Sequence, residues 1–293
     1  SFLACSGTWP DIAFVRSGLV ALAFFNNSRP CGPEHGIVLV DVSRPTRPLI
    51  VSSVDTPEGA HTITAHPSGR FIYASPGGLQ PGPFVSIVDV SNAAKPRVVE
   101  TFPAGQAGCH DISFSFTRRA KLGFCAAGVD RTTEIWDASD PMDPEPIGEI
   151  VNPAILFHHY AVATHDGRYL GLSDESVRCA PTQGSIWFYD ITDPRDPKLM
   201  SWFDMPPDRY PADPVNGYCT AHNFNFVPDT YTMTLAWYNS GLNVIDFKDP
   251  SAPIEIAHYS TPNVNYWSAY FYKGRVFASD MDRGLDVFEI EGL

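Results

Sequence analysis

The feature that most constrains the fold of this chain is a repeat that occurs six times. Each copy has an apolar, β-branched run that ends in an acidic residue, then a turn rich in Ser, Asp and Pro, as in GIVLVDVSRPTRP and GLNVIDFKDPSAP. The acidic positions are Asp41, Asp89, Asp137, Asp190, Asp246 and Glu289, which follow one another at intervals of 43 to 56 residues. Such intervals indicate one supersecondary unit per repeat. An Asp at a strand end accepts hydrogen bonds from the turn backbone, so we expect these acids to be structural.

A second hairpin precedes the repeated one. HTITAHPSGRFIYAS reads as strand, Pro-Ser-Gly turn and strand, and YWSAYFYKGRVFASD contains a Lys-Gly turn. Four antiparallel strands per repeat are the content of a propeller blade. The sequence therefore predicts an all-β, six-bladed β-propeller with few helices, forming a single domain over residues 1–293. The last copy ends after its third strand, and we expect residues 1–6 to supply the fourth and close the ring.

Four repeats open their first strand with a histidine: His61, His110, His159 and His222. His61 lies nine residues before Arg70, and His159 keeps the same spacing to Arg168. This register selects His159 over His158, with His158 kept as the alternative. Because the first strand of a blade is innermost, we expect the four imidazoles to converge at the mouth of the central channel.

Four neutral imidazoles suit one transition-metal ion, and Fe, Cu, Mn and Zn all remain open. Ligands from four blades of six leave coordination positions free, as metal catalysis requires. The alternative is a metal-free polar channel. The remaining histidines that fall in turns, loops or outer strands are expected at the surface: His35, His66, His165 and His258.

Acidic and aromatic residues accompany these histidines in the sequence. Asp111 follows His110, and Glu175 ends a strand of the fourth blade. We expect Asp111, Glu175 and Tyr160 to move protons, because carboxylates and phenols beside metal-bound histidines serve as general acids and bases. The residues expected to line a substrate funnel are Trp9, Phe157, Asp174, Tyr266, Trp267 and Asp280.

The six cysteines include no C-x-x-C pair. A Cys179–Cys219 disulfide is geometrically reasonable, and Cys5 and Cys31 flank the first blade in a similar way, with the pairing of the cysteines left open. Cys125 is expected to be a buried thiol. Cys109 stands beside His110, and neighbouring strand residues point in opposite directions, so the two are not expected to bind the same metal. The cysteines and the sequon at residues 26–28 favour an extracellular or periplasmic protein.

The net charge of −13 argues against nucleic acid as a partner, because an acidic surface repels phosphate. No apolar run approaches the roughly 18 residues of a membrane span. The sequence also contains no G-x-S-x-G, P-loop or dinucleotide fingerprint. These absences favour a small-molecule substrate and metal chemistry over serine-triad, nucleotide or NAD chemistry.

The repeated VLVDVS-x-P-x-x-P and LNVIDF-x-DP-x-x-P units resemble the LVIVD-repeat proteins, a family of β-propellers, over nearly the whole chain. The resemblance is closest to secreted bacterial members of the choice-of-anchor type. In those proteins A-H-N, T-H-D, T-H-Q and D-H-N elements open successive blades, and the last blade ends in S-D-x-x-R-G-L. This chain has GAHT, GCHD, FHHY, TAHN and SDMDRGL at these places, with Thr62 for Asn and Tyr160 for Gln. The resemblance implies the fold far more than a reaction.

The leading functional hypothesis is a metal-dependent enzyme that acts on a small organic substrate, with oxidation by an oxidase or oxygenase as the first reaction class. A lyase, isomerase or hydrolase reaction at the same metal is the alternative within this hypothesis. The second hypothesis is a non-catalytic propeller that binds a protein or glycan through its loops.

Overall fold

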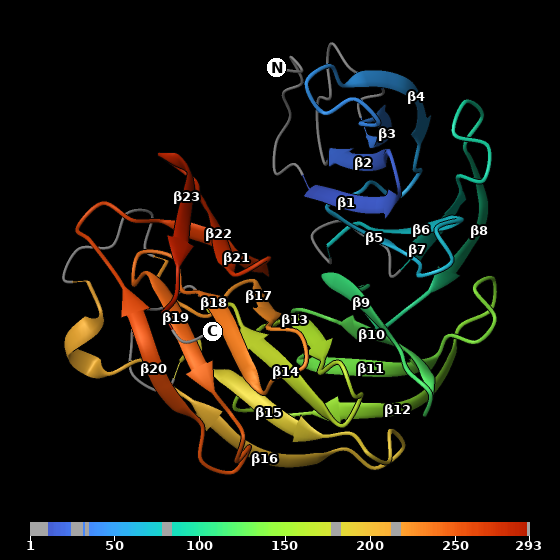
Figure 1. Cartoon of the computed structure of the whole chain (residues 1–293). Coiled ribbons are helices and arrows are strands. Elements are labelled where there is room, and N and C mark those ends of the chain that lie inside the picture. The colour runs from blue at the N-terminus through green and yellow to red at the C-terminus, as the bar shows by residue number, and fades with distance from the viewer. Residues whose placement is uncertain are drawn as a thin grey trace. The chain divides into compact units, whose positions relative to one another are not determined.

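A computed structural model describes residues 11–24, 32, 35–77, 84–176, 183–211 and 218–291. These residues form six antiparallel sheets that succeed one another along the chain (Figure 1). Five sheets have four strands each and the sixth has three. The protein is thus an all-β, six-bladed β-propeller, as the repeat predicts. The segment predicted to complete the last blade, residues 1–6, lies outside the described residues.

The first three blades contain strands β1 to β12. Blade one has β1 (Asp11–Arg16), β2 (Leu19–Phe24), β3 (Gly36–Asp41) and β4 (Leu49–Asp55). Blade two has β5 (Thr62–Ala65), β6 (Phe71–Ser75), β7 (Phe84–Asp89) and β8 (Arg97–Pro103). Blade three has β9 (Asp111–Phe116), β10 (Lys121–Ala126), β11 (Thr132–Asp137) and β12 (Glu145–Val151).

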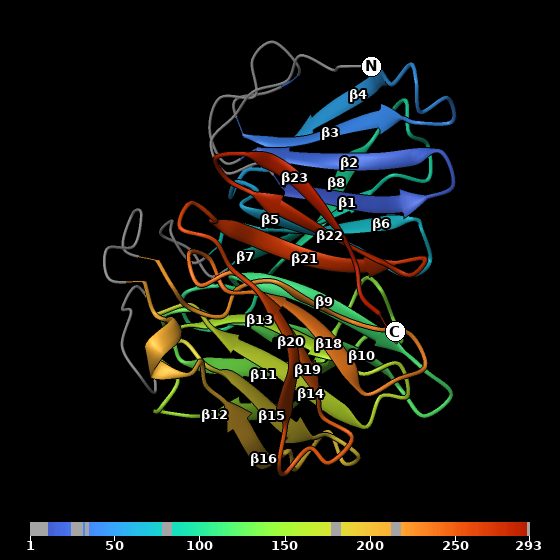
Figure 2. The same cartoon turned by 60° about the vertical axis from the view of Figure 1, so that its left-hand side comes forward.

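The last three blades contain strands β13 to β23, and Figure 2 gives a second view of them. Blade four has β13 (His158–Ala163), β14 (Tyr169–Asp174), β15 (Ile186–Asp190) and β16 (Lys198–Phe203). Blade five has β17 (Phe224–Phe226), β18 (Thr232–Ala236), β19 (Leu242–Asp246) and β20 (Ile254–Tyr259). Blade six has β21 (Tyr266–Tyr272), β22 (Arg275–Asp280) and β23 (Gly284–Glu289).

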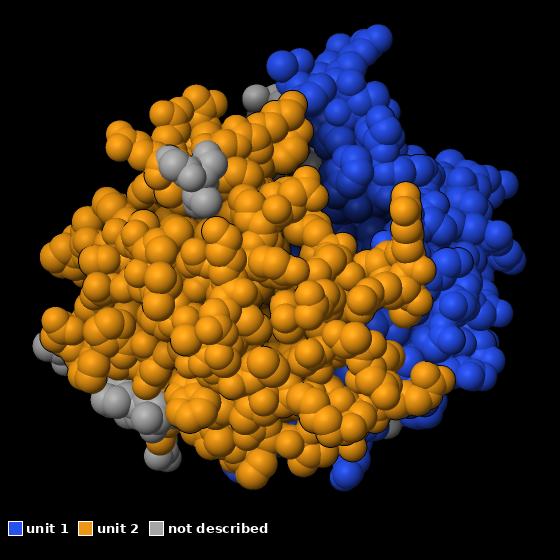
Figure 3. Space-filling model, turned by 60° about the horizontal axis from the view of Figure 1, so that its bottom comes forward, with its two compact units in different colours: residues 1–116, 121–147 blue, residues 117–120, 148–293 orange. Residues whose placement is uncertain are grey.

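The chain divides into two compact units (Figure 3). Unit 1 comprises residues 1–116 and 121–147, and unit 2 comprises residues 117–120 and 148–293. Within each unit, successive sheets pack face to face through buried apolar side chains. In unit 1, Ala21 and Leu39 of blade one share a cluster with Ile72 of blade two. In unit 2, Phe188 of blade four shares a cluster with Phe224 of blade five.

The repeated acidic residues hold the turns, as the sequence predicts. In five blades the carboxylate accepts a hydrogen bond of 2.7–2.9 Å from the backbone N–H two residues later: Asp41 from Ser43, Asp89 from Ser91, Asp137 from Ser139, Asp190 from Thr192, and Asp246 from Lys248. The carboxylate thus accepts from a backbone N–H of the turn, which has no hydrogen-bond partner on a neighbouring strand. The repeated Asp therefore stabilises the turn that follows the strand.

The cysteines correct one prediction from the sequence. Cys125 is bonded to Cys109 in a disulfide, and both are buried. Cys125 is therefore no thiol, and Cys109 is unavailable as a metal ligand. Cys219 is also disulfide-bonded, whereas its predicted partner Cys179 lies outside the described residues. Cys5, Cys31, Trp9 and the sequon at residues 26–28 lie outside them as well.

His66 corrects a second prediction. It was expected at the surface but is only 4% exposed. Its ring packs edge-on against Phe114 and Phe116 of blade three, which cover the turn that carries it. The other three histidines of that group, His35, His165 and His258, are exposed as expected.

Helical structure in the described part of the chain is limited to one 3-10 turn, Pro207–Arg209. No helix among the described residues is long and apolar enough to cross a membrane.

Replacing both Cys109 and Cys125 by Ala should lower the free energy of unfolding by about 3 kcal/mol, the loss expected when a cross-link closing a loop of about 15 residues is removed. The two cysteines are 16 residues apart in the sequence. Denaturant unfolding of the variant and the wild type measures the difference. Peptide mapping after alkylation without reduction is the control. Alkylated Cys109 in the unreduced wild type would contradict the disulfide.

Candidate functional site

The first strand of each of blades two to six begins with an irregularity that includes the predicted site position. In blade two, the N–H of His61 bonds to the carbonyl of Ser75, which is also the residue paired with Thr62. In blade four the pairing shifts between His158 and Tyr160, so that His159 is the extra residue. A β-bulge of this kind re-aims a side chain out of the alternation of the strand.

The same arrangement recurs in the other blades. The N–H of His110 bonds to the carbonyl of Ala126, the residue paired with Asp111. The N–H of His222 bonds to the carbonyl of Ala236. In blade six the extra residue is Trp267. The repeat thus delivers a histidine at equivalent places in blades two to five and a tryptophan in blade six.

In unit 1, His61 and His110 form a close pair. Their Nε2 atoms lie 3.1 Å apart, and the ring centroids are 4.7 Å apart. The hydroxyl of Thr62 donates to the carbonyl of His110 and fixes the second strand start against the first. Burial lowers the pKa of His61 to about 4, which keeps the imidazole neutral, the form that binds metals. The 3.1 Å separation is that of a hydrogen bond in which one ring nitrogen donates to the other.

Asp111 follows His110 in the sequence, begins β9 and is half-buried. Burial, and then the charge of Asp11, raises the pKa of Asp111 well above its ordinary value, against a hydrogen bond from the N–H of Ile112. Asp11 opens β1 and accepts a hydrogen bond from the N–H of Ile63. Unit 1 therefore brings two carboxyl groups close enough to repel each other.

In unit 2, His159 and His222 face the carboxylate of Glu175. The His159 Nε2 lies 3.5 Å from Glu175 Oε2, and the His222 Nε2 lies 3.6 Å from Glu175 Oε1. The two rings are 4.1 Å apart, and both histidines are almost fully buried. The far side of each ring is also engaged. His222 Nδ1 donates to the carbonyl of Trp267, and His159 Nδ1 lies 3.5 Å from the hydroxyl of Ser173.

His158 has a different environment from His159. It is fully buried, and a hydrogen bond to the backbone of Asn152 opposes the effect of burial, which lowers the pKa of His158 to about 4. Of the two neighbouring histidines, the structure sets His159 beside Glu175 and His158 against the loop before β13.

Tyr238 belongs to this cluster and was missed by the sequence analysis. Its hydroxyl donates to Glu175 Oε1, and its ring lies 4.5 Å from that of His222. Burial raises the pKa of Glu175 to about 7, although the hydrogen bond from Tyr238 lowers it and the charge of Asp174 raises it further. The sequence offered one indication of this role: Tyr238, in AWYNSG, occupies a turn position at which blade three has Gly128.

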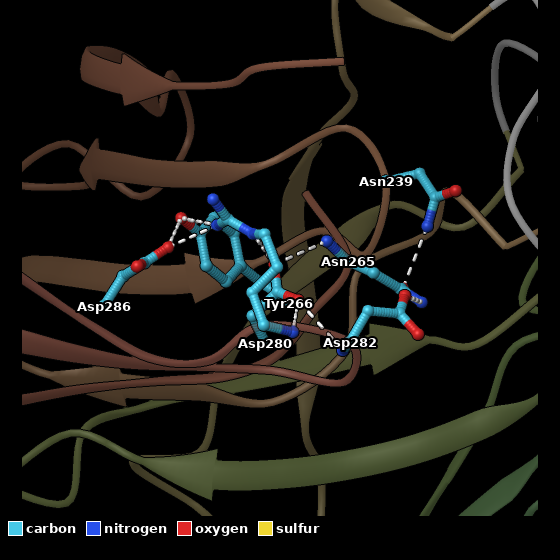
Figure 4. Close-up of polar contacts among 7 residues, drawn as sticks. Asn239, Asn265, Tyr266, Asp280, Asp282 and Asp286 are labelled. Atoms are coloured by element: carbon cyan, nitrogen blue, oxygen red, sulfur yellow. Dashed lines mark hydrogen bonds and ion pairs between the residues drawn. The ribbon is translucent and has the colours of Figure 1, made fainter. Parts of the chain in front are cut away.

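Asp174 and Asp280, predicted to line the substrate site, are engaged with backbone N–H groups. Asp174 accepts from Leu156, Phe157 and Gly184. Asp280 accepts from the N–H groups of Asn265, Asp282 and Arg283 and from the Arg283 side chain, in the network of Figure 4. Each carboxylate holds the loop that leads into the first strand of its blade.

The network around Asp280 extends in two directions (Figure 4). Asn239 donates to the Asn265 side chain at 2.9 Å, and Asn265 donates to Asp282 at 3.2 Å. On the other side, the hydroxyl of Tyr266 donates to Asp286 at 2.6 Å. Asp280, Asp282 and Asp286 thus accept hydrogen bonds from amide, phenol and guanidinium groups of blade six.

The predicted aromatic residues separate into two groups. Trp267 lies 4.4 Å from the His222 ring and Phe157 lies 6.5 Å from the His159 ring, and both are half-exposed. Tyr266 is fully buried in the core of blade six. Tyr160 packs against Phe224 in the apolar cluster between blades four and five. Of the predicted aromatic residues within the described ranges, Trp267 and Phe157 are therefore the two beside the histidines of unit 2.

Comparison with known proteins agrees with this architecture. The family profile described as LVIVD repeat matches residues 33–56 and 235–261. Comparison with curated proteins gave no match. Among solved structures, the periplasmic gluconolactonase of Pseudomonas aeruginosa is similar, with a TM-score of 0.74 and 13% identity over 96% of this chain and 81% of that one.

Two further structures have the same general fold. A hydrazine synthase of Kuenenia stuttgartiensis gives a TM-score of 0.68 at 13% identity, covering 95% of this chain and 75% of that one. A β-propeller domain from Myceliophteria thermophila gives 0.64 at 14%, covering 96% and 83%. At these identities the likeness shows the fold alone. The chain is a six-bladed β-propeller, and the profile match confirms its resemblance to the LVIVD-repeat family over the two matched repeats.

Glu175→Gln should gain stability relative to the wild type as the pH rises, in protein kept free of metal. The pKa of about 7 lies above the ordinary 4.5, so the native state binds more protons than the unfolded state between these values, and wild-type stability falls with rising pH. The amide does not titrate. The difference in free energy of unfolding should grow by up to about 3 kcal/mol across this interval and stay constant above it.

Denaturant unfolding with chelator present, at several pH values from about 4.5 to 8, measures this difference. A difference that does not change with pH would contradict the raised pKa of Glu175.

Proposed function

We propose that this protein is a metal-dependent enzyme and that His159, His222 and Glu175 bind one transition-metal ion. The observation that carries the proposal is the spacing of their donor atoms, 3.5 and 3.6 Å. These distances are too long for good hydrogen bonds. Metal–ligand bonds of about 2.0–2.2 Å, at angles of about 90–109°, place neighbouring donor atoms about 2.8–3.6 Å apart. Each of the two histidine–carboxylate spacings therefore falls in the range found between ligands of one ion.

The hydrogen bonds of His222 support the same conclusion. A carbonyl oxygen can only accept, so His222 Nδ1 carries the hydrogen that it donates to Trp267. In the neutral ring, Nε2 then presents a lone pair towards Glu175 Oε1. A lone pair facing an ionised carboxylate oxygen in a buried site is unfavourable unless a proton or a metal ion lies between them. The arrangement of His222 is that of a metal-bound histidine with its second nitrogen held by a backbone carbonyl.

The four-histidine set predicted from the repeat register also includes His61 and His110 of unit 1. Their Nε2 separation of 3.1 Å lies in the same range of ligand spacings. The pair stays a predicted metal-binding element of unit 1, and variants in each pair test whether it binds metal. The donor set of imidazoles with a carboxylate is compatible with Fe, Cu, Mn or Zn.

For the reaction, we propose oxidation of a small organic substrate. Two histidines and one carboxylate are the ligand set of non-haem iron(II) oxygenases, and this observation favours an oxidoreductase over a lyase or hydrolase. A metal held in this way supplies a position at which dioxygen or the substrate can bind. Trp267 and Phe157, which flank the two histidines, would shield that position and pack against the substrate. Proton transfer by Asp111 remains part of the proposal.

We also propose that the protein functions outside the cytoplasm. The Cys109–Cys125 disulfide and the disulfide-bonded Cys219 support this, because such bonds persist in oxidising compartments.

Protein purified without chelator should contain about one transition-metal ion per chain, and substitution of a ligand should lower this content. His159→Ala and His222→Ala test unit 2, and His61→Ala and His110→Ala test unit 1. His165→Ala is the matched control, because His165 is an exposed histidine in blade four. Elemental analysis and Zn²⁺ or Co²⁺ titration measure the binding.

Absence of metal from the wild type, together with no binding in titration, would contradict the proposal and favour the non-catalytic propeller. Loss of metal in the unit 2 variants alone would restrict the site to His159, His222 and Glu175.

A further inference from the structure

Tyr238 has an unusual backbone conformation for a buried aromatic residue. Its φ is +43°, in the left-handed region that disfavours bulky side chains. Among the described residues, the other non-glycine residues with positive φ are Arg131, Asp229 and Lys273, and all three are exposed. Tyr238, in contrast, is 2% exposed. A strained residue held inside the protein calls for an explanation in terms of its side chain.

The turn itself does not require tyrosine. In blade five the N–H of Gly241 bonds to the carbonyl of Tyr238, and the N–H of Ser240 bonds to that of Trp237. Blade three makes the same two bonds, from Arg131 to Gly128 and from Asp130 to Ala127. There the left-handed position is Gly128, with φ +42°. Glycine adopts this conformation without strain, so it would serve the turn better than tyrosine.

The backbone of Tyr238 also contacts blade six, where its carbonyl accepts a hydrogen bond from the N–H of Tyr266. Any residue would provide this contact. What only a tyrosine provides is the hydroxyl, which donates to Glu175 Oε1. The ring reaches that place between Tyr218, at 5.1 Å, and His222, at 4.5 Å.

We propose that Tyr238 is a positioning residue of the metal site: its hydroxyl holds the Glu175 carboxylate in the orientation that faces His159 and His222. This inference rests on the proposed metal-binding function. Glu175 has two oxygens, and each lies near a different histidine nitrogen. The single donated hydrogen bond selects this orientation of the carboxylate among those that its side-chain torsions allow. The strain at Tyr238 is maintained because the orientation of Glu175 depends on it.

Tyr238→Phe tests the inference, because it keeps the ring and the turn and removes only the hydroxyl. Loss of a hydrogen bond to a metal-binding carboxylate weakens metal affinity by about 10- to 100-fold. We expect the variant to bind Co²⁺ at least about ten-fold more weakly than the wild type, with an altered visible absorption of the bound ion. Chelator-treated protein titrated with Co²⁺ provides both readouts.

Tyr189→Phe is the matched control. It also removes a buried phenol hydrogen bond in unit 2, the one that Tyr189 accepts from Asn152 at 2.8 Å. It should leave Co²⁺ affinity and the spectrum unchanged. Equal affinity and equal spectra for Tyr238→Phe and the wild type would overturn the inference and leave the metal site intact. Equal losses in both variants would also overturn it, since the effect would then be one of stability. A wild type that binds no Co²⁺ would overturn the proposed function along with it.

Discussion

The interaction on which the site depends is the irregular start of the first strand in blades two to six. In a regular strand, successive side chains point to opposite faces of the sheet. The direction of a histidine is therefore fixed by that of the core residue beside it. The extra residue removes this constraint at His159 and Trp267, and the double pairing at Ser75 does so for His61. After this irregularity, the side chains of each strand again alternate between the two faces of the sheet. The irregular start therefore determines the site, and the regular part of the strand determines the core of the blade.

A second constraint fixes the loops that carry these strand starts. Buried or half-buried carboxylates bind the backbone N–H groups of the preceding loop: Asp130 with Gln106 and Ala107, Asp174 with Leu156 and Phe157, and Asp280 with Asn265. Each accepts hydrogen bonds that would otherwise be lost on burial. Asp174 and Asp280, predicted to line the substrate site, thus also fix the loops before the first strands of their blades. Glu175, which follows Asp174, is the acid of this region that faces the histidines.

Much of the fold was predictable because a repeat specifies its own periodicity. The Asp–Pro turns and the Gly-containing hairpins placed the strands, and the spacing to Arg168 distinguished His159 from His158. What the sequence could not show depended on packing between blades. His66 sits in a turn, but Phe114 and Phe116 of the next blade bury it. Cys125 lies in the middle of a strand, and its bond to Cys109 depends on how the irregular start of β9 directs Cys109.

Two energetically unfavourable features lie side by side in unit 2: the left-handed backbone of Tyr238 and the burial of the Glu175 carboxyl group. A left-handed conformation costs a non-glycine residue about 1–2 kcal/mol. Burial of Glu175 between two imidazoles raises its pKa and so opposes its ionised form. The turn does not need a tyrosine, since blade three builds the same turn with Gly128. Backbone strain and a buried acid that contact each other, as Tyr238 and Glu175 do, are typical of functional sites. The strained Tyr238 and the buried Glu175 are therefore consistent with the function proposed for this site.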